Sequence, residues 1–120
     1  MLPGSLDVHT DGPVVIARLS GEIDLSNAKA IGSLVVSAVE NHADGVVLDL
    51  TPTTYLDSSG VHLVFQLAER LAERQQQLVL AIPEDSRVRR VLDLVNVKAM
   101  VPVCPSVEEA RALVTSSSGE

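Results

Sequence analysis

Short aliphatic runs alternate with amphipathic segments along this sequence, and the alternation limits the fold more than any other feature does. Three runs rich in Val, Leu and Ile, at 14–19, 45–50 and 77–82, are typical of buried strands. Each run is followed by a segment whose apolar residues recur every three or four positions, as on the buried side of a helix. We therefore predict an α/β fold with right-handed crossovers and a mainly parallel sheet.

Turn and capping signals complete an element order of ββαβαβαβα. A strand at 6–10 turns through Asp11-Gly12-Pro13 into the strand at 14–19. Because the two strands are so close in sequence, they should form an antiparallel hairpin at one edge of the sheet. A last, weak strand is predicted at 100–103.

Four helices are expected, each starting at a polar residue that can cap free N–H groups. The expected starts are Ser26, Asp57 or Ser58, Ser86 and Ser106, and the first three ends lie near 41–44, Gln75 and Asn96. Loops are expected at 21–24 and 51–55. The apolar residues expected to face the core are Ile31, Leu34, Val35 and Ala38 in the first helix, Val61, Val64, Phe65, Ala68, Leu71 and Ala72 in the second, and Val88, Val91, Leu92 and Val95 in the third.

The composition indicates one domain with an aliphatic core. At 120 residues we expect a single domain over 1–120, with its core at about 6–114, a short leader at 1–5 and a polar tail at 115–120. Hydrophobic residues make up 46% of the chain, yet Trp is absent and Tyr and Phe occur once each. Nine basic and sixteen acidic residues give a net charge of −7, which disfavours nucleic acid and anionic membranes as partners.

The sequence offers no sign of a cofactor, a metal site or a membrane segment. His9 and His42 have no companions at ligand spacing, and no Gly-rich phosphate-binding segment is present. The apolar runs are too short to span a membrane, and the N-terminus lacks a secretory signal pattern. Cys104 is the only cysteine, so no internal disulfide can form, and we predict a cytoplasmic protein. The thiol itself is expected to be inert.

The segment Leu56-Asp57-Ser58-Ser59-Gly60 lies where the sequence changes from an extended run to a helix. Free N–H groups at a helix start bind capping side chains and anions, so two roles are open. Asp57 can be an ordinary helix cap, and the hydroxyls can form a site that accepts a phosphoryl group. The two roles are compatible.

Asp57, Ser58 and His62 also supply the three residue types of a hydrolase triad. Residues this close along one helix seldom converge as a triad requires, and Leu56 occupies the position of the Gly in a nucleophile elbow. We therefore do not expect an enzyme, and a hydrolase that uses Ser58 remains only as the alternative from another class.

Three segments together resemble the STAS domain family, and within it the anti-sigma factor antagonists. They are Gly21-Glu22-Ile23-Asp24, the strand end Leu48-Asp49-Leu50, and Leu56-Asp57-Ser58-Ser59-Gly60-Val61. The resemblance spans nearly the whole chain and implies a STAS-type domain. It also implies a cycle in which the unphosphorylated antagonist binds an anti-sigma factor with serine kinase activity and frees a sigma factor. Phosphorylation by that kinase ends the binding, and a metal-dependent serine phosphatase restores it.

The resemblance assigns expected roles to individual residues. The acceptor is the hydroxyl directly after the Asp, here Ser58, with Ser59 as the second choice. The residues expected to contact the partner are Glu22, Asp24, Asp57, Ser59, Gly60 and His62. The alternative within the family is a STAS scaffold or a sensor of a small ligand that has no phosphorylation cycle.

His62 departs from the family pattern, in which a small residue is usual at this position. It lies four residues after Ser58, so the two share a helix face, and its charged form should pair with a phosphate there and slow dephosphorylation. A phosphate adds about −1.5 to −2 charges. The helix start tolerates this charge, whereas a partner fitted to the neighbouring carboxylates is repelled. We therefore predict a switch in binding and not in folding.

Overall fold

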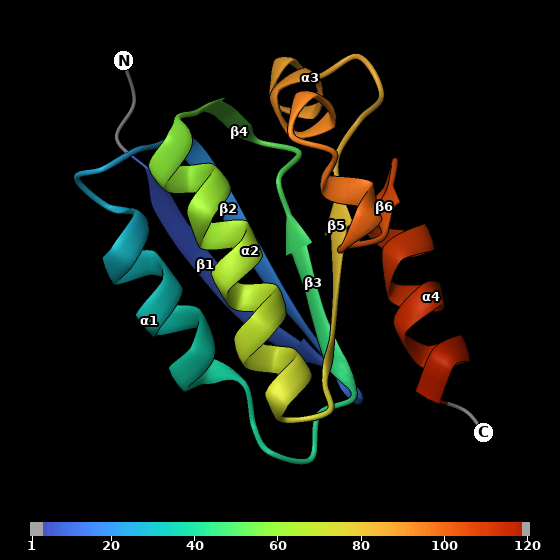
Figure 1. Ribbon diagram of the computed structural model, residues 1–120. Coiled ribbons are helices and arrows are strands. Elements are labelled where there is room, and N and C mark those ends of the chain that lie inside the picture. The colour runs from blue at the N-terminus through green and yellow to red at the C-terminus, as the bar shows by residue number, and fades with distance from the viewer. Residues whose placement is uncertain (1–3, 119–120) are drawn as a thin grey trace.

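Six strands form one mixed sheet at the centre of the computed structural model, which describes residues 4–118 (Figure 1). The strands are β1 (Ser5–Asp11), β2 (Val14–Ile23), β3 (Gly45–Asp49), β4 (Thr53–Leu56), β5 (Gln77–Ala81) and β6 (Val103–Cys104). The helices are α1 (Ala28–Ala38), α2 (Ser58–Glu73), α3 (Arg87–Leu94) and α4 (Val107–Ser118), with a short 3-10 helix, η1, at Val97–Ala99. The predicted α/β architecture is confirmed.

The sheet has the predicted hairpin at one edge and parallel pairing elsewhere. β1 and β2 are antiparallel, with Ser5 opposite Ser20 and Asp11 opposite Val14. The strand order is β1-β2-β3-β5-β6, and β4 pairs with the last part of β2. Since β2, β3 and β5 run in the same direction, their carboxyl ends meet at one end of the sheet, which is also where α2 begins.

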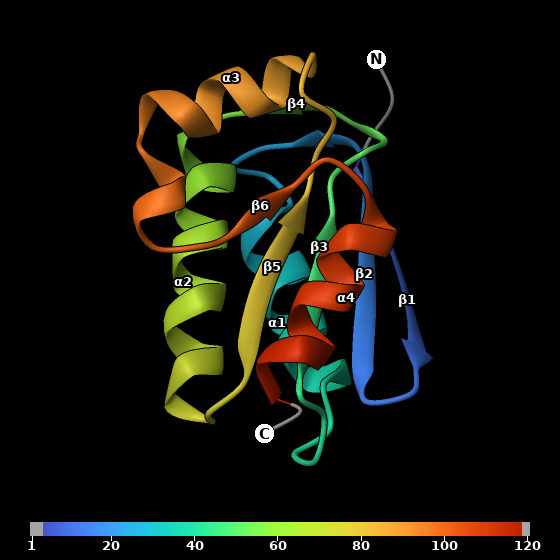
Figure 2. The same ribbon diagram turned by 90° about the vertical axis from the view of Figure 1, so that its right-hand side faces the viewer.

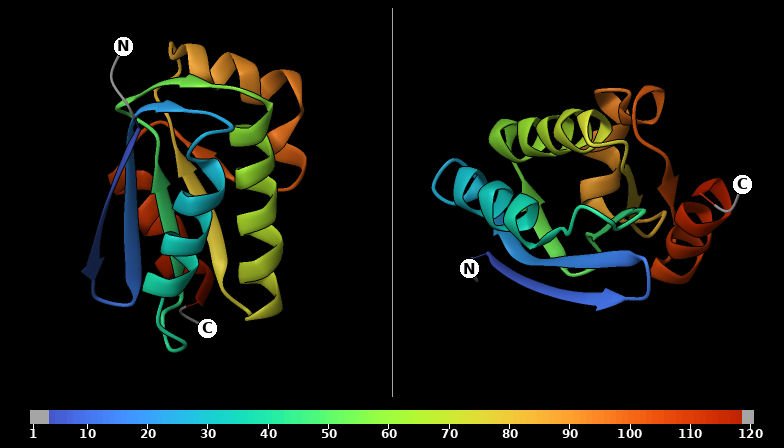
Figure 3. Two further views of the ribbon diagram at one scale, coloured as in Figure 1. Left: turned by 90° about the vertical axis from the view of Figure 1, so that its left-hand side faces the viewer. Right: turned by 90° about the horizontal axis from the view of Figure 1, so that it is seen from below.

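Helices cover both faces of the sheet. α1 and α2 lie side by side on one face and α4 on the other, while α3 crosses the end of the sheet next to β4 (Figures 2 and 3). A larger aliphatic cluster lies under α1 and α2 and includes Leu19, Leu48 and Leu67. A smaller cluster lies under α4 and includes Val47 and Val79. The aliphatic core inferred from the composition is confirmed, and its burial is the main stabilising contribution.

β4 corrects the predicted element order, which has loops at 51–55 and 21–24. β4 pairs in parallel with residues 21–23, which prolong β2. The register shifts between Gly21 and Glu22, and the φ of 79° at Gly21 is one that glycine adopts without strain. Neither segment is long enough to be recognised as a strand by itself. Each becomes one because the other satisfies its backbone N–H and C=O groups.

The start of α1 also differs from the prediction, because Ser26 does not cap it. The N–H and the hydroxyl of Ser26 both donate to Oδ1 of Asp24 and close a turn before the helix. Asn27 precedes the helix, and its Oδ1 accepts from the N–H of Asp24 at 2.9 Å while its Nδ2 donates to the Glu22 carbonyl at 2.9 Å. α1 then ends at Ala38, before the predicted 41–44.

The buried faces of the helices agree with the prediction in part. In α2, Leu63 and Leu67 are buried and Ala72 is exposed, so the true face is rotated from the predicted stripe. Leu34 of α1 is 58% exposed, since the side of α1 that carries Gly32 lies against α2. Val95 is 43% exposed because α3 ends one residue before it.

The caps of the last two helices are confirmed. Ser86 Oγ accepts from the N–H of Val88 at 3.1 Å, and Ser106 Oγ accepts from the N–H of Glu109 at 3.2 Å. Asn96 follows α3 in the left-handed conformation, with a φ of 57°, as expected of a residue that closes a helix.

The ends of the chain contain more regular structure than predicted. β1 already begins at Ser5, in the segment expected as a leader, and α4 continues to Ser118, in the segment expected as a polar tail. Residues 1–3 and 119–120 lie outside the described residues. The weak strand predicted at 100–103 is the two-residue β6.

Cys104 in β6 is partly buried, and its surroundings keep the thiol protonated. Burial raises the pKa of this thiol, the Glu109 carboxylate raises it further, and the Arg89 guanidinium opposes the two. The protonated thiol is a poor nucleophile, in agreement with the expectation of an inert cysteine.

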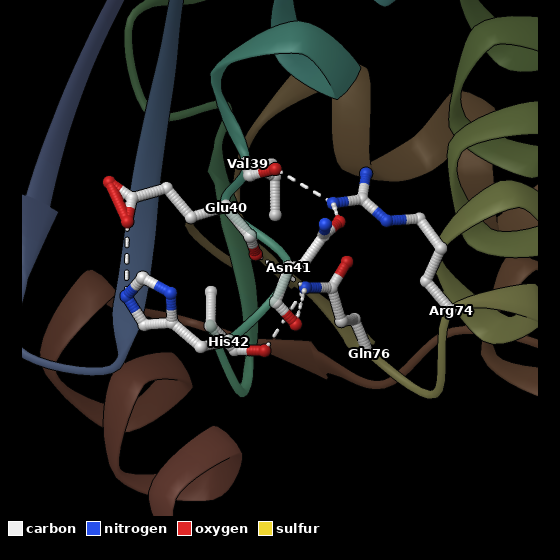
Figure 4. Close-up of polar contacts among 7 residues, drawn as sticks. Val39, Glu40, Asn41, His42, Arg74 and Gln76 are labelled. Atoms are coloured by element: carbon white, nitrogen blue, oxygen red, sulfur yellow. Dashed lines mark hydrogen bonds and ion pairs between the residues drawn. The ribbon is translucent and has the colours of Figure 1, made fainter.

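At the end of the sheet remote from Ser58, two side chains donate hydrogen bonds to backbone carbonyls and hold neighbouring loops together. Arg74 Nη2 donates to the Val39 carbonyl at 2.7 Å, and Nε2 of the buried Gln76 donates to the carbonyls of Glu40 at 2.8 Å and Ala43 at 3.1 Å (Figure 4). These bonds tie the turn after α2 to the loop after α1. They therefore help to fix how the two helices lie relative to each other.

We expect Gly60→Ala to destabilise the fold more than Gly32→Ala does. A Cβ at Gly60 would overlap the Leu56 side chain and approach the Ile23 carbonyl oxygen to 3.2 Å, so the backbone would have to move. Overpacking of this kind costs about 1–3 kcal/mol. At Gly32 the Cβ meets only Cδ1 of Leu63, at 2.7 Å, which can rotate away, and alanine improves the helix propensity. Urea unfolding measures both variants, and equal losses in the free energy of unfolding would contradict this expectation.

Candidate functional site

Asp57 joins the start of α2 to the loop between β2 and α1. Its backbone is extended, with φ −94° and ψ −170°, and Oδ1 accepts hydrogen bonds from the N–H groups of Ser59 at 2.8 Å and Gly60 at 3.1 Å. The predicted helix cap is thus confirmed. Oδ2 accepts from the N–H of Leu25 at 3.2 Å. One carboxylate therefore holds together two segments that are 32 positions apart in sequence.

Ser58 is the first residue of α2 and is exposed. No hydrogen bond engages its hydroxyl within the part of the chain that the structure describes. Ser59 is partly buried, and Gly60 is buried against Leu56. Of the two hydroxyls in the motif, that of Ser58 is therefore the more accessible to a reagent from solvent.

Glu22 and Asp24 lie next to this junction, as the sequence led us to expect. Glu22 is opposite Tyr55 in the pairing of β2 with β4, and Asp24 follows directly after β2. Both are partly buried. The carboxylate of Asp24 is already engaged, because it accepts hydrogen bonds from the N–H and the hydroxyl of Ser26. The carboxylate of Glu22 has no such bond among the described residues.

A groove of about 470 Å³ opens between the start of α1 and the start of α2. Ser58, Ser59 and His62 line it from α2, so the structure brings these three predicted site residues together. The full lining is Leu25, Ala28, Lys29, Ser58, Ser59, His62, Leu63 and Gln66. Glu22 and Asp24 are not part of this lining and form a neighbouring rim.

The sequence did not identify five of the eight lining residues as part of a site, among them Leu25 and Lys29. Leu25 is 81% exposed, although it is a large apolar side chain. Its position directly after the Gly-Glu-Ile-Asp segment, outside any helical or strand pattern, was a usable signal. Lys29 gave no such signal, because only the packing of α1 against α2 brings it to the same groove as Ser58.

The chemistry of the site suits recognition better than catalysis. No hydrogen bond links Ser58, His62 and Asp57 in the described chain, and both oxygens of Asp57 are already bound to backbone N–H groups. A triad needs a base that accepts the serine proton and a carboxylate that orients the base. An exposed hydroxyl beside a groove, with apolar and polar walls, is instead suited to contact another protein.

Two further properties of the described residues concern metals and membranes. Across residues 4–118, no group of three or more His, Cys, Asp or Glu side chains is placed to hold a metal ion. Among the same residues, every helix is too short or too polar to serve as a membrane span.

The sequence matches a known domain family and a curated relative. Residues 5–110 match the STAS domain family. The "putative anti-sigma factor antagonist BtrV" of Bordetella bronchiseptica is 31% identical over 99 residues, which cover 82% of this chain and 84% of that protein.

Solved structures show the same fold at lower identity. A crystal structure of an anti-sigma factor antagonist from Mycobacterium paratuberculosis has a TM-score of 0.79 at 24% identity, covering 93% of this chain and 94% of that one. SpoIIAA of Bacillus in its phosphorylated form has a TM-score of 0.69 at 21% identity, covering 92% and 99%. The unphosphorylated form of SpoIIAA has a TM-score of 0.70 at 19% identity, covering 97% and 100%.

These similarities agree with the mixed sheet, the antiparallel β1–β2 hairpin and the helix that starts at the Asp-Ser-Ser-Gly segment. The chain has the STAS fold and belongs to the family of anti-sigma factor antagonists.

Proposed function

We propose that this protein binds an anti-sigma factor that is also a serine kinase, and that phosphorylation of Ser58 ends the binding. The observation that carries the proposal is the exposed, unbonded hydroxyl of Ser58 at a helix start whose capping carboxylate is fully occupied. Anti-sigma factor antagonists are non-catalytic regulatory proteins. In this role Ser58 is the substrate of other enzymes, and the release of the partner controls a sigma factor and hence transcription.

The partner surface would consist of the junction and its acidic rim. It comprises Glu22, Asp24, Asp57, Ser59, Gly60 and His62 around Ser58. A phosphate would add a charge of about −1.5 to −2 to a surface that already carries three carboxylates. A partner that places a negative charge of its own next to Ser58 is then repelled, because like charges at an interface cost several kcal/mol.

The fold itself should tolerate the phosphate. Ser58 points to solvent from the first turn of α2, where the helix dipole favours an anion by about 0.3–1 kcal/mol. The Asp57 cap uses the N–H groups of Ser59 and Gly60 and does not involve the Ser58 hydroxyl. The switch therefore acts on binding. That SpoIIAA, which shares this fold, has been solved in both unphosphorylated and phosphorylated forms supports such a cycle.

The cycle needs a second enzyme and a shared compartment. A metal-dependent serine phosphatase would restore the unphosphorylated form, and the exposure of Ser58 at the start of α2 gives it access. Since the anti-sigma factor acts where transcription takes place, we propose that this protein works in the bacterial cytoplasm.

Incubation with a purified anti-sigma factor kinase from the same organism, ATP and Mg²⁺ should modify Ser58, because its hydroxyl is the accessible one of the pair. Mass spectrometry of the peptide that contains residues 57–62 identifies the position. Ser59→Ala is the matched control and should still be modified, whereas Ser58→Ala should not. A kinase that binds this protein but leaves Ser58 unmodified would favour the alternative of a STAS scaffold or ligand sensor.

Substitutions at Ser58 should separate binding from phosphorylation. Ser58→Ala should keep the Kd for the kinase partner within about threefold, while Ser58→Asp should weaken it about tenfold or more through repulsion. Ser37→Asp adds the same charge to an exposed position of α1 and is the control. Isothermal titration calorimetry measures all three. Equal affinities for Ser58→Asp and Ser37→Asp would contradict an electrostatic switch at Ser58.

Phosphorylation of Ser58 should shift the titration midpoint of the His62 imidazole to higher pH, because a protonated imidazole can pair with a phosphate one helical turn away. NMR titration of the protein with and without the phosphate measures this shift. His42, on the loop after α1, does not line the groove and provides a control in the same spectra (Figure 4). An unchanged midpoint for His62 would rule out the pairing.

A further inference from the structure

Lys29, in the first turn of α1, is a cation without a partner beside the Ser58 groove. The chain has only one other lysine, Lys98. Three of the seven arginines form ion pairs with carboxylates, and Lys29 has no ion pair or hydrogen bond of its side chain within residues 4–118. A positive charge left unpaired in so acidic a protein is available to an anion that enters the groove.

Among the described residues, no carboxylate forms an ion pair with Lys29. Asp24 is bonded to Ser26, and Asp57 accepts three backbone N–H groups. Glu22, on β2, is the remaining carboxylate of the rim. None of the eight residues that line the groove is acidic. Lys29 and His62 are the two lining residues that can carry charge, and both charges are positive.

We propose that Lys29 is the counter-ion of a phosphate on Ser58, an inference that rests on the proposed function. A lysine carries a compact ammonium group on a flexible four-carbon stem, and a phosphoserine offers three strong acceptor oxygens. Lys29 approaches from the α1 wall of the groove, whereas His62 lies on the α2 wall with Ser58. The phosphate is therefore bound from both walls, and Lys29 is a positioning residue for the phosphorylated state.

This pairing gives the phosphate a second effect besides repulsion. In the unphosphorylated protein the groove is open and Leu25 at its edge is 81% exposed, so a partner side chain can enter it. A phosphate held by Lys29 occupies part of the groove between Ser58 and α1. The partner is then excluded from the space that it would occupy, as well as repelled by the added charge.

A titration of the phosphate itself tests the pairing. Phosphoserine incorporated at position 58 during translation makes the test independent of any kinase, and ³¹P NMR gives the second pKa of the phosphate, which is ordinarily about 6. A nearby cation favours the dianion and lowers this pKa. Lys29→Gln should therefore raise the pKa of the phosphate by about 0.2–0.7 unit, the range that corresponds to exposed ion pairs. Lys29→Arg should restore most of the lowering.

Lys98→Gln is the matched control, because it removes the same charge from η1, outside the groove. Since Lys98 does not line the groove and salt screens charges that are not in contact, this variant should change the pKa less than Lys29→Gln does. Thermal melting followed by circular dichroism confirms that each variant is folded. Equal shifts for the two variants, or none for Lys29→Gln, would overturn the proposal. A shift specific to Lys29 in a protein that no kinase modifies would instead refute the proposed function while leaving the pairing intact.

Discussion

The carboxylate of Asp57 is the interaction on which the site depends. It binds the N–H groups of Ser59 and Gly60 at the start of α2 and the N–H of Leu25 in the loop before α1. Each of these bonds satisfies a backbone donor that would otherwise have no partner in the protein. Since the two segments come from different crossovers of the sheet, the same carboxylate ties the two walls of the groove to each other. Its loss would therefore loosen the cap and the groove together.

This arrangement keeps the proposed phosphorylation site apart from the interactions that stabilise the fold. The core under α1 and α2 is a continuous aliphatic cluster, and the contacts of Gln76 and Arg74 fix the far ends of those helices. Ser58 takes part in none of these interactions. A phosphate there adds charge at a position that the fold does not use, next to Lys29 and the acidic rim. The free energy of the modification can then appear almost entirely in partner binding, which is what a reversible switch requires.

Much of the fold could be predicted from local patterns. The three aliphatic strands, the Gly-Pro hairpin and the caps at Ser86 and Ser106 follow from signals within a few residues of each other. The errors concern segments whose structure depends on a distant partner. β4 and the end of β2 are strands only because they pair with each other. Ser26 does not cap α1 because it donates its hydrogen bonds to Asp24 instead. In both cases the structure depends on which of several possible contacts is the most stable, and a local sequence pattern does not reveal this.

The sequence by itself determined the α/β class, the aliphatic core and the position of Asp57-Ser58-Ser59-Gly60 at a helix start, because hydrophobic periodicity and capping chemistry are local. Only the tertiary structure decided that Lys29 and Leu25 share a groove with Ser58. These residues are about thirty positions from Ser58 in sequence, and their meeting depends on how closely α1 packs on α2. Gly32 lies at this contact, where an added Cβ would come within 2.7 Å of Leu63 Cδ1. The position of Ser58 at a helix start thus follows from the sequence, and the residues that surround it follow from the fold.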